Sequence, residues 1–524
     1  MPHETDRAGE RMTVAATRPQ RPPRTTLREL QDVLPDETTV LGDDATVVTG
    51  VSLSTQRILP GDLYAALPGS RVHGIDFVGD ALESGAVAVL TDVVGASLVR
   101  PGSPLLAGVP VVVTEDPRKA LGRVAARVYG DPAAALRMIG VTGTQGKTTT
   151  TRLLEGGLQR AGVTAGVIGT VGTRIAGKDV KTSLTTPEAP DLHALFARMR
   201  EQKVTACAME VSSHALVLGR VDGVVFDVAV FLNLGRDHLD FHRDVADYYA
   251  AKASLFTPER ARRGLVNIDD EHGRRLAAEA PIPVRTFSTN SDADWRAVDV
   301  ELGPQGSTFT VVGPDVRLEA RCPLPGDFNV TNTLAAIAAA AEAGLDATRV
   351  ANGIGQSSGV PGRLERVEAG QDFTLVVDYA HKPDAVEAAI RTLRPLTDGR
   401  VIVVLGAGGD RDAGKRPLMG ELAGRLADVV VVTDDNPRDE DPAAIRAAVL
   451  AGARRGSAEV VEIGDRRAAV AEAVARAATG DIVLVAGKGH ETGQEVAGVV
   501  HPFDDRQVAR EVLITRLRGT TGMA

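Results

Sequence analysis

Cysteine is scarce in this sequence, since only two of its 524 residues are cysteines. Two thiols cannot form the disulfide framework of a small secreted domain. Cys207 and Cys322 each lie in an apolar or strand-like context, so we expect both to be buried and unreactive. This cysteine usage is typical of a reducing compartment, and we expect a cytoplasmic protein.

Long apolar runs and an excess of basic charge are also absent. No apolar run approaches the roughly 20 residues that a membrane-spanning helix needs, and the polar, Arg/Pro-rich N-terminal stretch lacks the apolar core of a secretory signal. The net charge of −10 argues against a general nucleic-acid or membrane-surface binder. We interpret residues 1–26 as a disordered tail.

The length and rhythm of the chain predict three α/β domains, because 524 residues exceed what one core usually supports. The apolar runs FTLVVD, RVIVVL and DIVLVA, each followed by a loop, indicate a parallel, doubly wound sheet near the C-terminus. We expect a small N-terminal α/β domain, a central domain with a mostly parallel sheet and a Rossmann-like C-terminal domain, at residues 27–134, 135–358 and 359–524. The Gly/Ser/Pro-rich stretch at residues 355–363 predicts a linker.

The stretch RMIGVTGTQGKTTTT, which starts at Arg137, predicts a loop that binds nucleotide phosphates. Gly143 and Gly146 allow backbone N–H groups to turn toward an anion. Lys147 adds a positive charge, and Thr148 offers a hydroxyl to Mg²⁺. The helical pattern that follows adds the dipole of a helix N-terminus. The predicted loop comprises Gly143, Thr144, Gln145, Gly146, Lys147, Thr148 and Thr149.

Three residues downstream are candidates to face this loop. Glu210 ends one apolar strand, His238 follows another, and Lys252 lies on a predicted helix. In an open parallel sheet the carboxyl ends of the strands line the ligand crevice. Each residue taken alone has a structural alternative, such as an exposed glutamate or a capping histidine.

Together these motifs resemble those of the Mur ligases, the ATP-dependent amide-bond ligases of cell-wall precursor synthesis. The resemblance covers roughly residues 45 to 515, and the motifs occur in the family's order: GTQGKTTTT, LTTPEAPDLH, EVSSHAL, NLGRDHLDFH, PGDFNVTN, PGRLERV and DYAHKPD. It implies that ATP phosphorylates the terminal carboxylate of UDP-MurNAc-L-Ala-D-Glu. An amine then attacks the acyl phosphate, and phosphate leaves.

The motif DNPR in the last domain belongs, within this family, to members that add meso-diaminopimelate, whereas members that add L-lysine usually depart from it. Diaminopimelate is lysine with a second carboxylate, and arginine binds a carboxylate through two parallel hydrogen bonds. We assign this task to Arg438, and Glu491 could bind the distal ammonium. Amidated diaminopimelate remains an alternative, and DDNPR alone could be a turn. The implied site comprises Arg411, Asp435, Asn436, Pro437, Arg438, Gly487 and Glu491.

The resemblance implies the remaining contacts as well. Catalysis would fall to Lys147, Glu210, His238 and Lys252. Further contacts with ATP would come from Asn329, Arg363, Asp378 and His381. The UDP substrate would contact Ser52, Ser54, His73, Thr185, Thr186, Ser212 and Arg220. Magnesium would be held by Thr148, Glu210, His238 and Lys252.

In this family the lysine that matches Lys252 is carbamylated by CO₂, which converts a cation into an oxygen ligand that suits Mg²⁺. The substrates would reach three domains, so we expect closure about a hinge near residues 355–362. We expect a monomer that acts on small molecules.

Four other interpretations remain open from the sequence. A folylpolyglutamate synthase would share the phosphate loop but lack a UDP-binding first domain. A motor or transport ATPase would more often show GxxxxGK[ST], whereas position 141 here is valine. A non-catalytic regulator would more readily have lost Lys147, Glu210 or Lys252. The stretch GAGGDR resembles a dinucleotide fingerprint, but Arg411 replaces its third glycine.

Overall fold

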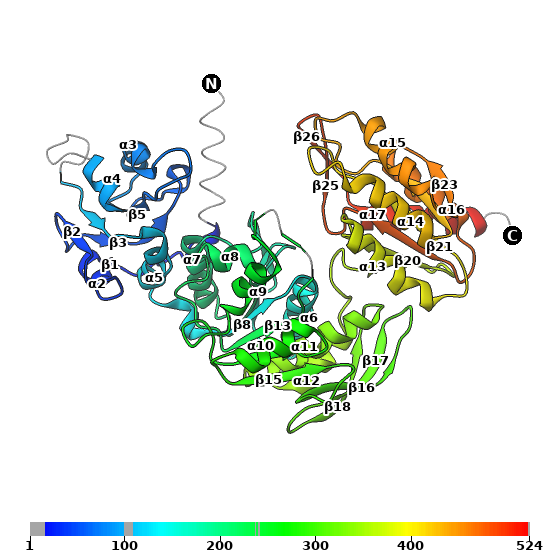
Figure 1. The fold of residues 1–524 in the computed structure, drawn as a ribbon, viewed down its shortest axis with the longest axis horizontal. Helices are drawn as coiled ribbons and strands as arrows, with labels where there is room; N and C mark the ends of the chain where they lie inside the picture. The colour runs from blue at the N-terminus through cyan, green and yellow to red at the C-terminus, as the bar shows by residue number, and fades with distance from the viewer. Residues whose placement is uncertain (1–15, 99–107, 236, 239–240, 522–524) are drawn as a thin grey trace. The chain divides into compact units, whose positions relative to one another are not determined.

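Figure 1 shows the computed structural model, which describes residues 16–98, 108–235, 237–238 and 241–521. It contains three α/β domains, each built on its own sheet, as the sequence predicts. Most of the predicted tail, residues 1–15, lies outside the described residues. Within the described ranges, no helix combines the length and apolar character needed to cross a membrane.

The N-terminal domain (blue in Figure 1) contains a five-stranded sheet and a small ribbon. Its strands are β1 (Thr25–Thr26), β2 (Thr39–Leu41), β3 (Val47–Val48), β4 (Gly50–Ser52), β5 (Asp62–Ala65), β6 (Ala88–Thr91) and β7 (Val111–Val113). Its helices are α2 (Leu27–Gln31), α3 (Val78–Glu83), α4 (Val93–Leu98) and α5 (Pro117–Val128), with 3₁₀ turns η1 (Thr55–Arg57) and η2 (Gly74–Phe77). The sheet order is β2-β7-β6-β5-β4, and only β2 is antiparallel to its neighbour.

The segment just before this domain packs against it. Arg18 is buried, and its Nη1 donates to Asp62 Oδ1 at 2.8 Å. The backbone N–H groups of residues 20 and 21 donate to the carboxylate of Glu201 at 2.9 and 2.7 Å. We expected disorder up to residue 26 from the polar composition. That expectation does not hold here, because the partner of Arg18 lies 44 residues away and local composition cannot reveal it.

The central domain (cyan to green in Figure 1) contributes to an eleven-stranded sheet. The strands are β8 (Arg137–Thr142), β9 (Ala165–Ile168), β10 (Thr173–Ile175), β11 (Lys178–Val180), β12 (Ala206–Glu210), β13 (Val228–Phe231), β14 (Gly264–Asn267), β15 (Val284–Ser288), β16 (Trp295–Glu301), β17 (Ser307–Val312) and β18 (Arg317–Cys322). Their order is β11-β10-β9-β12-β8-β13-β14-β15-β16-β17-β18, and the strands from β9 to β15 in this order are parallel neighbours.

Helices follow most of these parallel strands, which places the loops between them at the carboxyl edge of the sheet. The helices are η4 (Pro132–Ala135), α6 (Lys147–Arg160), α7 (Ala189–Glu201), α8 (Ser213–Val217), α9 (Val245–Ala253), α10 (Glu271–Glu279), α11 (Asp327–Glu342) and α12 (Ala347–Gly355). No helix or strand lies between α12 and Glu365, so the predicted linker is a loop. Its action as a hinge stays a prediction.

The C-terminal domain (yellow to red in Figure 1) contains a six-stranded sheet and a hairpin. The strands are β19 (Glu365–Arg366), β20 (Thr374–Asp378), β21 (Val401–Leu405), β22 (Val429–Val432), β23 (Glu459–Glu462), β24 (Ile482–Ala486), β25 (Gly493–Val496) and β26 (Val499–Pro502). The helices are α13 (Pro383–Leu393), η5 (Arg394–Leu396), α14 (Lys415–Leu426), α15 (Pro442–Ala453), α16 (Arg466–Arg476) and α17 (Asp505–Thr521).

This sheet has the order β19-β20-β24-β21-β22-β23, and all of its strands except β19 run parallel. One apolar core lies on each face of the sheet. The strands are therefore buried on both sides, which explains why they appear in the sequence as continuous runs of Val, Ile and Leu. The predicted doubly wound sheet is confirmed.

Both cysteines are fully buried and unbonded to each other. Burial raises the pKa of Cys322 to about 11 and also raises the pKa of Cys207. Neither thiol is therefore ionised near neutral pH, which confirms the expectation of unreactive cysteines.

Candidate active site

The predicted phosphate loop connects β8 to α6. Gly143 and Gly146 have φ values of 151° and 87°, a region that residues with a Cβ rarely adopt. Lys147 is the first residue of α6, and its Nζ donates to the carbonyl oxygens of Gly143 and Thr144 at 2.7 and 3.0 Å. The loop therefore combines the N-terminus of a 14-residue helix with a lysine, an arrangement suited to an anion.

Asn233, two residues beyond β13, supports the loop. Its Oδ1 accepts from the backbone N–H groups of Thr144 and Gln145 at 3.2 and 2.9 Å. Asn233 is not among the residues predicted from the sequence. Its position just after an apolar strand, FLN, was the available signal.

Lys252, on α9, contacts the same loop. Its Nζ donates to the carbonyl oxygen of Gly143 at 2.9 Å and lies 4.6 Å from the centre of the Tyr248 ring. The lysine is only 1% exposed. Burial, and secondarily the positive charge of Lys147, lower the pKa of Lys252 well below its usual value. A larger fraction of this amine is therefore uncharged than of an ordinary lysine.

Glu210 ends β12, is 1% exposed, and is held by one residue. The backbone N–H of Thr170 donates to Oε1 at 2.8 Å, and the Thr170 hydroxyl donates to Oε2 at 3.1 Å. Arg152 on α6 donates in turn to the carbonyl oxygens of the two residues after Thr170, at 2.5 and 3.0 Å. Thr170 thus fixes both carboxylate oxygens. Thr170 is not among the residues predicted from the sequence, although it also follows a strand, β9.

The expected metal ligands do not share one acidic cluster. His238 has a positive φ of 56° and packs edge-on against His214, with ring centres 4.9 Å apart. Across the described parts of the chain, no three His, Cys, Asp or Glu side chains group as a metal site. The predicted ligand set also includes the hydroxyl of Thr148 and a modified Lys252, and threonine and lysine are not among those four residue types.

The residues expected to hold the sugar peptide surround Glu210. The Thr186 hydroxyl donates to the Glu210 carbonyl at 2.8 Å and accepts from the Ser212 N–H at 3.2 Å. Thr185 Oγ1 lies 3.1 Å from Thr170 Oγ1. Arg220 Nη1 donates to the Thr186 carbonyl at 3.3 Å. Thr185 is therefore connected to the Glu210 carboxylate through Thr170, and the other three residues are connected to the Glu210 backbone carbonyl directly or through Thr186.

Ser52, Ser54 and His73 lie in loops of the N-terminal domain. The Ser52 hydroxyl, at the end of β4, donates to the Ser54 carbonyl at 2.8 Å. His73 Nδ1 accepts from the N–H of Ile75 at 3.0 Å, so a neutral ring carries its proton on Nε2, 3.1 Å from Asp92 Oδ1. Asp92, which directly follows β6, was not predicted.

The candidate ATP contacts in the C-terminal domain cluster after β20. Leu364 donates its N–H to Asp378 Oδ2 at 2.7 Å, and burial raises the pKa of that carboxyl. The Arg363 guanidinium lies 5.0 Å from the Tyr379 ring centre. His381 Nδ1 lies 2.8 Å from the Tyr379 carbonyl, and burial lowers its pKa. Asn329 makes a local contact instead: its Nδ2 donates to Pro325 O at 2.8 Å.

The DNPR loop follows β22 and meets the loop that follows β24. Lys488, fully buried, donates to Asn436 Oδ1 at 2.8 Å and to Glu491 Oε2 at 3.2 Å. Asn436 Nδ2 donates to the same Glu491 oxygen at 2.9 Å. Gly487, at φ 122°, lies where a Cβ would approach Asp435 Oδ2 to 2.7 Å. Lys488 is not among the residues predicted from the sequence, although it also lies just beyond a strand, β24.

Arg438 has two partners. Its Nε donates to Glu495 Oε2 at 3.1 Å, and its Nη1 donates to the carbonyl oxygen of Gly409 at 2.5 Å. A Cβ on Gly408 would lie 3.1 Å from Nη1, so this glycine makes room for the guanidinium. Arg411 is exposed in the same loop after β21. The structure thus brings the predicted diaminopimelate residues together at the carboxyl edge of the sheet.

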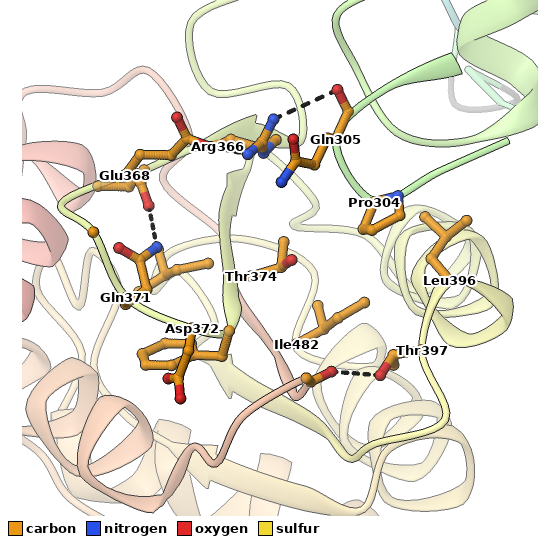
Figure 2. A pocket seen from close by; sticks show the side chains of 15 residues that line it. Pro304, Gln305, Arg366, Glu368, Gln371, Asp372, Thr374, Leu396, Thr397 and Ile482 are labelled. Carbon is orange, nitrogen blue, oxygen red and sulfur yellow. Dashed lines mark hydrogen bonds and ion pairs between the residues drawn. The ribbon is translucent and has the colours of Figure 1, made fainter. Parts of the chain in front are cut away.

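A pocket of about 610 Å³ lies at the other end of these strands, as Figure 2 shows. Thr374 and Ile482, the first residues of β20 and β24, line it together with Pro304 and Gln305. It contains none of the predicted site residues, so we assign it no part in the site.

The chain has a glycine loop between a strand and a helix, with a buried lysine beside the loop. A second cluster of charged loop residues lies on a doubly wound sheet. These features define a nucleotide-binding α/β protein of several domains. Three family models match the chain: the Mur ligase family catalytic domain at residues 47–129, the Mur ligase middle domain at residues 141–340 and the Mur ligase glutamate ligase domain at residues 362–489. The chain belongs to the Mur ligase family.

Similar proteins share most of the chain. It is 58% identical over 475 residues to the UDP-N-acetylmuramoyl-L-alanyl-D-glutamate–2,6-diaminopimelate ligase of Streptomyces avermitilis, covering 89% of this chain and 92% of that one. The ligase of the same name from Streptomyces coelicolor is 56% identical over 505 residues, covering 95% and 98%. A solved structure of a ligase with this name matches with a TM-score of 0.68 at 32% identity, covering 94% and 100%.

A folylpolyglutamate synthase structure from Mycobacterium tuberculosis shares the fold at 20% identity, with a TM-score of 0.56. The match covers 69% of this chain and 91% of the synthase chain. The match of residues 47–129 to the Mur ligase family catalytic domain and the 58% identity to a diaminopimelate ligase disfavour the folylpolyglutamate synthase interpretation. Membership of the ligase family also disfavours the transport-ATPase interpretation.

Proposed function

We propose that this chain is an ATP-dependent ligase that joins meso-2,6-diaminopimelate to UDP-N-acetylmuramoyl-L-alanyl-D-glutamate in peptidoglycan precursor synthesis. The observation that carries the proposal is the intact DNPR loop, gathered with Glu491 and Lys488, in a chain 58% identical to a ligase of that name. The protein acts on small molecules as a cytoplasmic monomer. Its net charge of −10 supports the absence of a nucleic-acid partner.

The chemistry requires a carboxylate to become an electrophile. The γ-phosphoryl group of ATP passes to a carboxylate oxygen of the D-glutamate, and ADP leaves. The diaminopimelate amine then attacks the carbonyl carbon, the C–N bond forms, the C–O bond to phosphate breaks and the amine loses a proton. Two anions meet in the first step, so a cation must offset their repulsion, and Lys147 at the phosphate loop is suited to that task.

The residues at the loop fit Mg²⁺, which prefers oxygen ligands. The Thr148 hydroxyl lies in the first turn of α6, and the buried Glu210 carboxylate is held in one orientation by Thr170. His238 and a carbamylated Lys252 would complete the set. Bound Mg²⁺ would add positive charge at the phosphates.

The buried amine of Lys252 supports its carbamylation. Only an uncharged amine adds to CO₂, and burial lowers the pKa of Lys252 well below that of an exposed lysine. The product is an anion, which the nearby Lys147 cation would stabilise. With this modification the Lys252 side chain would provide an oxygen ligand for Mg²⁺.

The UDP substrate spans the first two domains in this proposal. Ser52, Ser54 and His73 contact the uridine and diphosphate, and the sugar peptide lies against Thr185, Thr186, Ser212 and Arg220. The four central-domain residues gather around Glu210. Asn329, Arg363, Asp378 and His381 contact ATP, and the diaminopimelate site is the DNPR cluster with Arg411, Gly487 and Glu491.

Phosphate release tests the reaction. The purified chain is incubated with ATP, Mg²⁺ and UDP-MurNAc-L-Ala-D-Glu, with meso-diaminopimelate, amidated diaminopimelate or L-lysine in separate reactions. We expect release with meso-diaminopimelate, together with a UDP-MurNAc-tripeptide detected by mass. Release without an amino acid and without the UDP substrate would contradict the ligase and point to an ATPase.

A further inference from the structure

The hairpin β25–β26 runs alongside the DNPR loop. The N–H of Arg438 donates to the Glu495 carbonyl at 3.0 Å, and the N–H of Ala497 donates to the Arg438 carbonyl at 2.7 Å. These two bonds form a short parallel bridge between Arg438 and Val496. The backbone therefore fixes the position of Glu495 relative to Arg438.

The side chains of Arg438 and Glu495 form an ion pair that solvent can reach. Their exposed fractions are 23% and 39%, and Nε of Arg438 lies 3.1 Å from Oε2 of Glu495. Nη1 is bonded to the Gly409 carbonyl, while Nη2 has no acceptor among the residues that the structure describes. A carboxylate that binds the Nε/Nη2 edge through both oxygens would thus gain a donor that Glu495 does not use.

Glu491, the other carboxylate in the cluster, already has cationic and amide partners. Its Oε2 accepts from Asn436 and from Lys488, whose ammonium is fully buried. Lys488 has a second carboxylate, Asp435 Oδ1, at the longer distance of 3.5 Å, so loss of Glu491 would leave a fully buried cation with the weaker of its two carboxylate contacts, which is destabilising. Among the residues that the structure describes, Glu495 has one ion-pair partner, the half-buried Arg438, and an ion pair that solvent reaches is weak. Glu495 can therefore change partner at little cost.

We propose that Arg438 and Glu495 together bind the distal amino-acid centre of diaminopimelate, with Arg438 on its carboxylate and Glu495 on its ammonium. This inference rests on the proposed function. The distal carbon carries both charges on neighbouring atoms, so a matched pair of opposite charges complements it. The internal ion pair separates and each partner takes the opposite charge of the ligand, so the charge balance of the site is preserved.

Such a pair would make Glu495 a specificity-determining residue. A centre held through its carboxylate, its ammonium and its carbon chain is fixed in handedness. Glu495 would therefore help to distinguish meso-diaminopimelate from the LL isomer. It would also favour diaminopimelate over L-2-aminopimelate, which keeps the reacting amine and the distal carboxylate but lacks the distal ammonium.

The test compares wild type and Glu495→Gln with meso-diaminopimelate and with L-2-aminopimelate as the variable substrate. We expect Glu495→Gln to raise KM for meso-diaminopimelate by about tenfold, the range of a charge-assisted hydrogen bond. KM for L-2-aminopimelate should stay within about twofold, and kcat and the KM for ATP should be nearly unchanged. Glu495→Asp, which keeps the charge, should have an intermediate effect.

Glu459→Gln is the matched control, because Glu459 pairs with Arg476 at 2.6 Å on β23, outside the cluster. Equal increases in KM for both substrates would show that Glu495 only positions Arg438, and would overturn the proposal. A decrease in KM for meso-diaminopimelate would show that Glu495 competes with the substrate carboxylate for Arg438, and this result would also overturn the proposal. If wild type does not use meso-diaminopimelate at all, the proposed function itself fails, which is a separate outcome.

Discussion

The polar groups that surround the phosphate loop are mostly backbone groups, whereas those that surround the DNPR loop are charged side chains. In the first region, glycines at positive φ, the helix N-terminus and the Asn233 amide set the loop conformation. In the second, Lys488, Glu491, Arg438 and Glu495 hold one another through ion pairs. A backbone site binds any nucleotide triphosphate of the right shape, while a charged site can distinguish amino acids that differ by one carboxylate.

This contrast indicates that the two regions have different roles in the reaction. Changes at the phosphate loop should affect every substrate combination, because they remove the activation step. Changes at the DNPR cluster should affect only the choice and affinity of the amino acid. Four predictions test this difference between the two regions, in order from the largest expected effect on activity to the smallest.

Lys147→Ala should lower kcat/KM for ATP by about 10²- to 10³-fold, because the variant loses the cation beside the developing charge. The loss should be the same with meso-diaminopimelate and with any poorer amino acid. Steady-state phosphate release measures it, with Lys178→Ala on the exposed edge of β11 as the control. A loss of kcat/KM seen with only one amino-acid substrate would contradict the separate roles of the two regions.

Arg438→Lys should raise KM for meso-diaminopimelate by about ten- to a hundredfold, since lysine cannot bind a carboxylate through two parallel hydrogen bonds. KM for ATP should not change. Titration of the amino acid at saturating ATP and UDP substrate measures the effect. An equal increase in KM for ATP would indicate that the variant disturbs the whole domain.

Thr170→Val should weaken Mg²⁺ binding by about tenfold, the usual effect of losing a partner that orients a metal ligand. The variant keeps the backbone N–H bond to Glu210 Oε1 and loses the hydroxyl bond to Oε2. The Mg²⁺ dependence of ATP binding, followed by calorimetry, measures this without turnover. Thr205→Val, at an exposed position just before β12, should leave the Mg²⁺ dependence unchanged.

His193→Leu should leave activity at neutral pH unchanged but alter stability in acid. Burial lowers the pKa of His193 to about 4, so the folded chain keeps the ring neutral while the unfolded chain binds a proton below about pH 6.5. Stability is therefore fully present above pH 6.5 and falls as the pH drops toward 4, by about 3 kcal/mol from this group.

The variant should lose that part of the pH dependence. Thermal unfolding of both proteins at pH 7.5 and pH 4.5 measures the difference. The same loss of stability in both would show that other groups cause the acid sensitivity. His193 hydrogen-bonds to the Asp222 carbonyl at 3.0 Å and to no predicted site residue in the described part of the chain, so this experiment separates the scaffold from the two sites.

The sequence predicted the backbone features well, because they depend on neighbouring residues. The runs VIVVL, VVVV and IVLVA become β21, β22 and β24, and the loop after β8 lies between strand and helix as expected. The rule that polar residues at the ends of parallel strands face a common crevice identified Glu210, whereas Asn436 was identified through the family motif DNPR. Applied more widely, the rule would also have found Thr170, Asn233, Asp92 and Lys488.

The long-range pairs were not predictable in this way. Glu495 lies on a hairpin strand, where nothing in the local pattern distinguishes it from other exposed polar residues. Arg18 lies in a polar, proline-rich segment, and its partner Asp62 is distant in the sequence. Such pairs depend on tertiary contacts, and the sequence alone gives no spacing from which to infer them.

The most direct test of the central claim is the ratio of kcat/KM for meso-diaminopimelate to that for L-lysine, at saturating ATP and UDP substrate. A site built to bind the second carboxylate rejects an analogue that lacks it by about 10⁴-fold or more. We predict a ratio of that order, with product formation confirmed by mass. A ratio near one would contradict the account, because the charged cluster around Arg438 would then not select the amino acid.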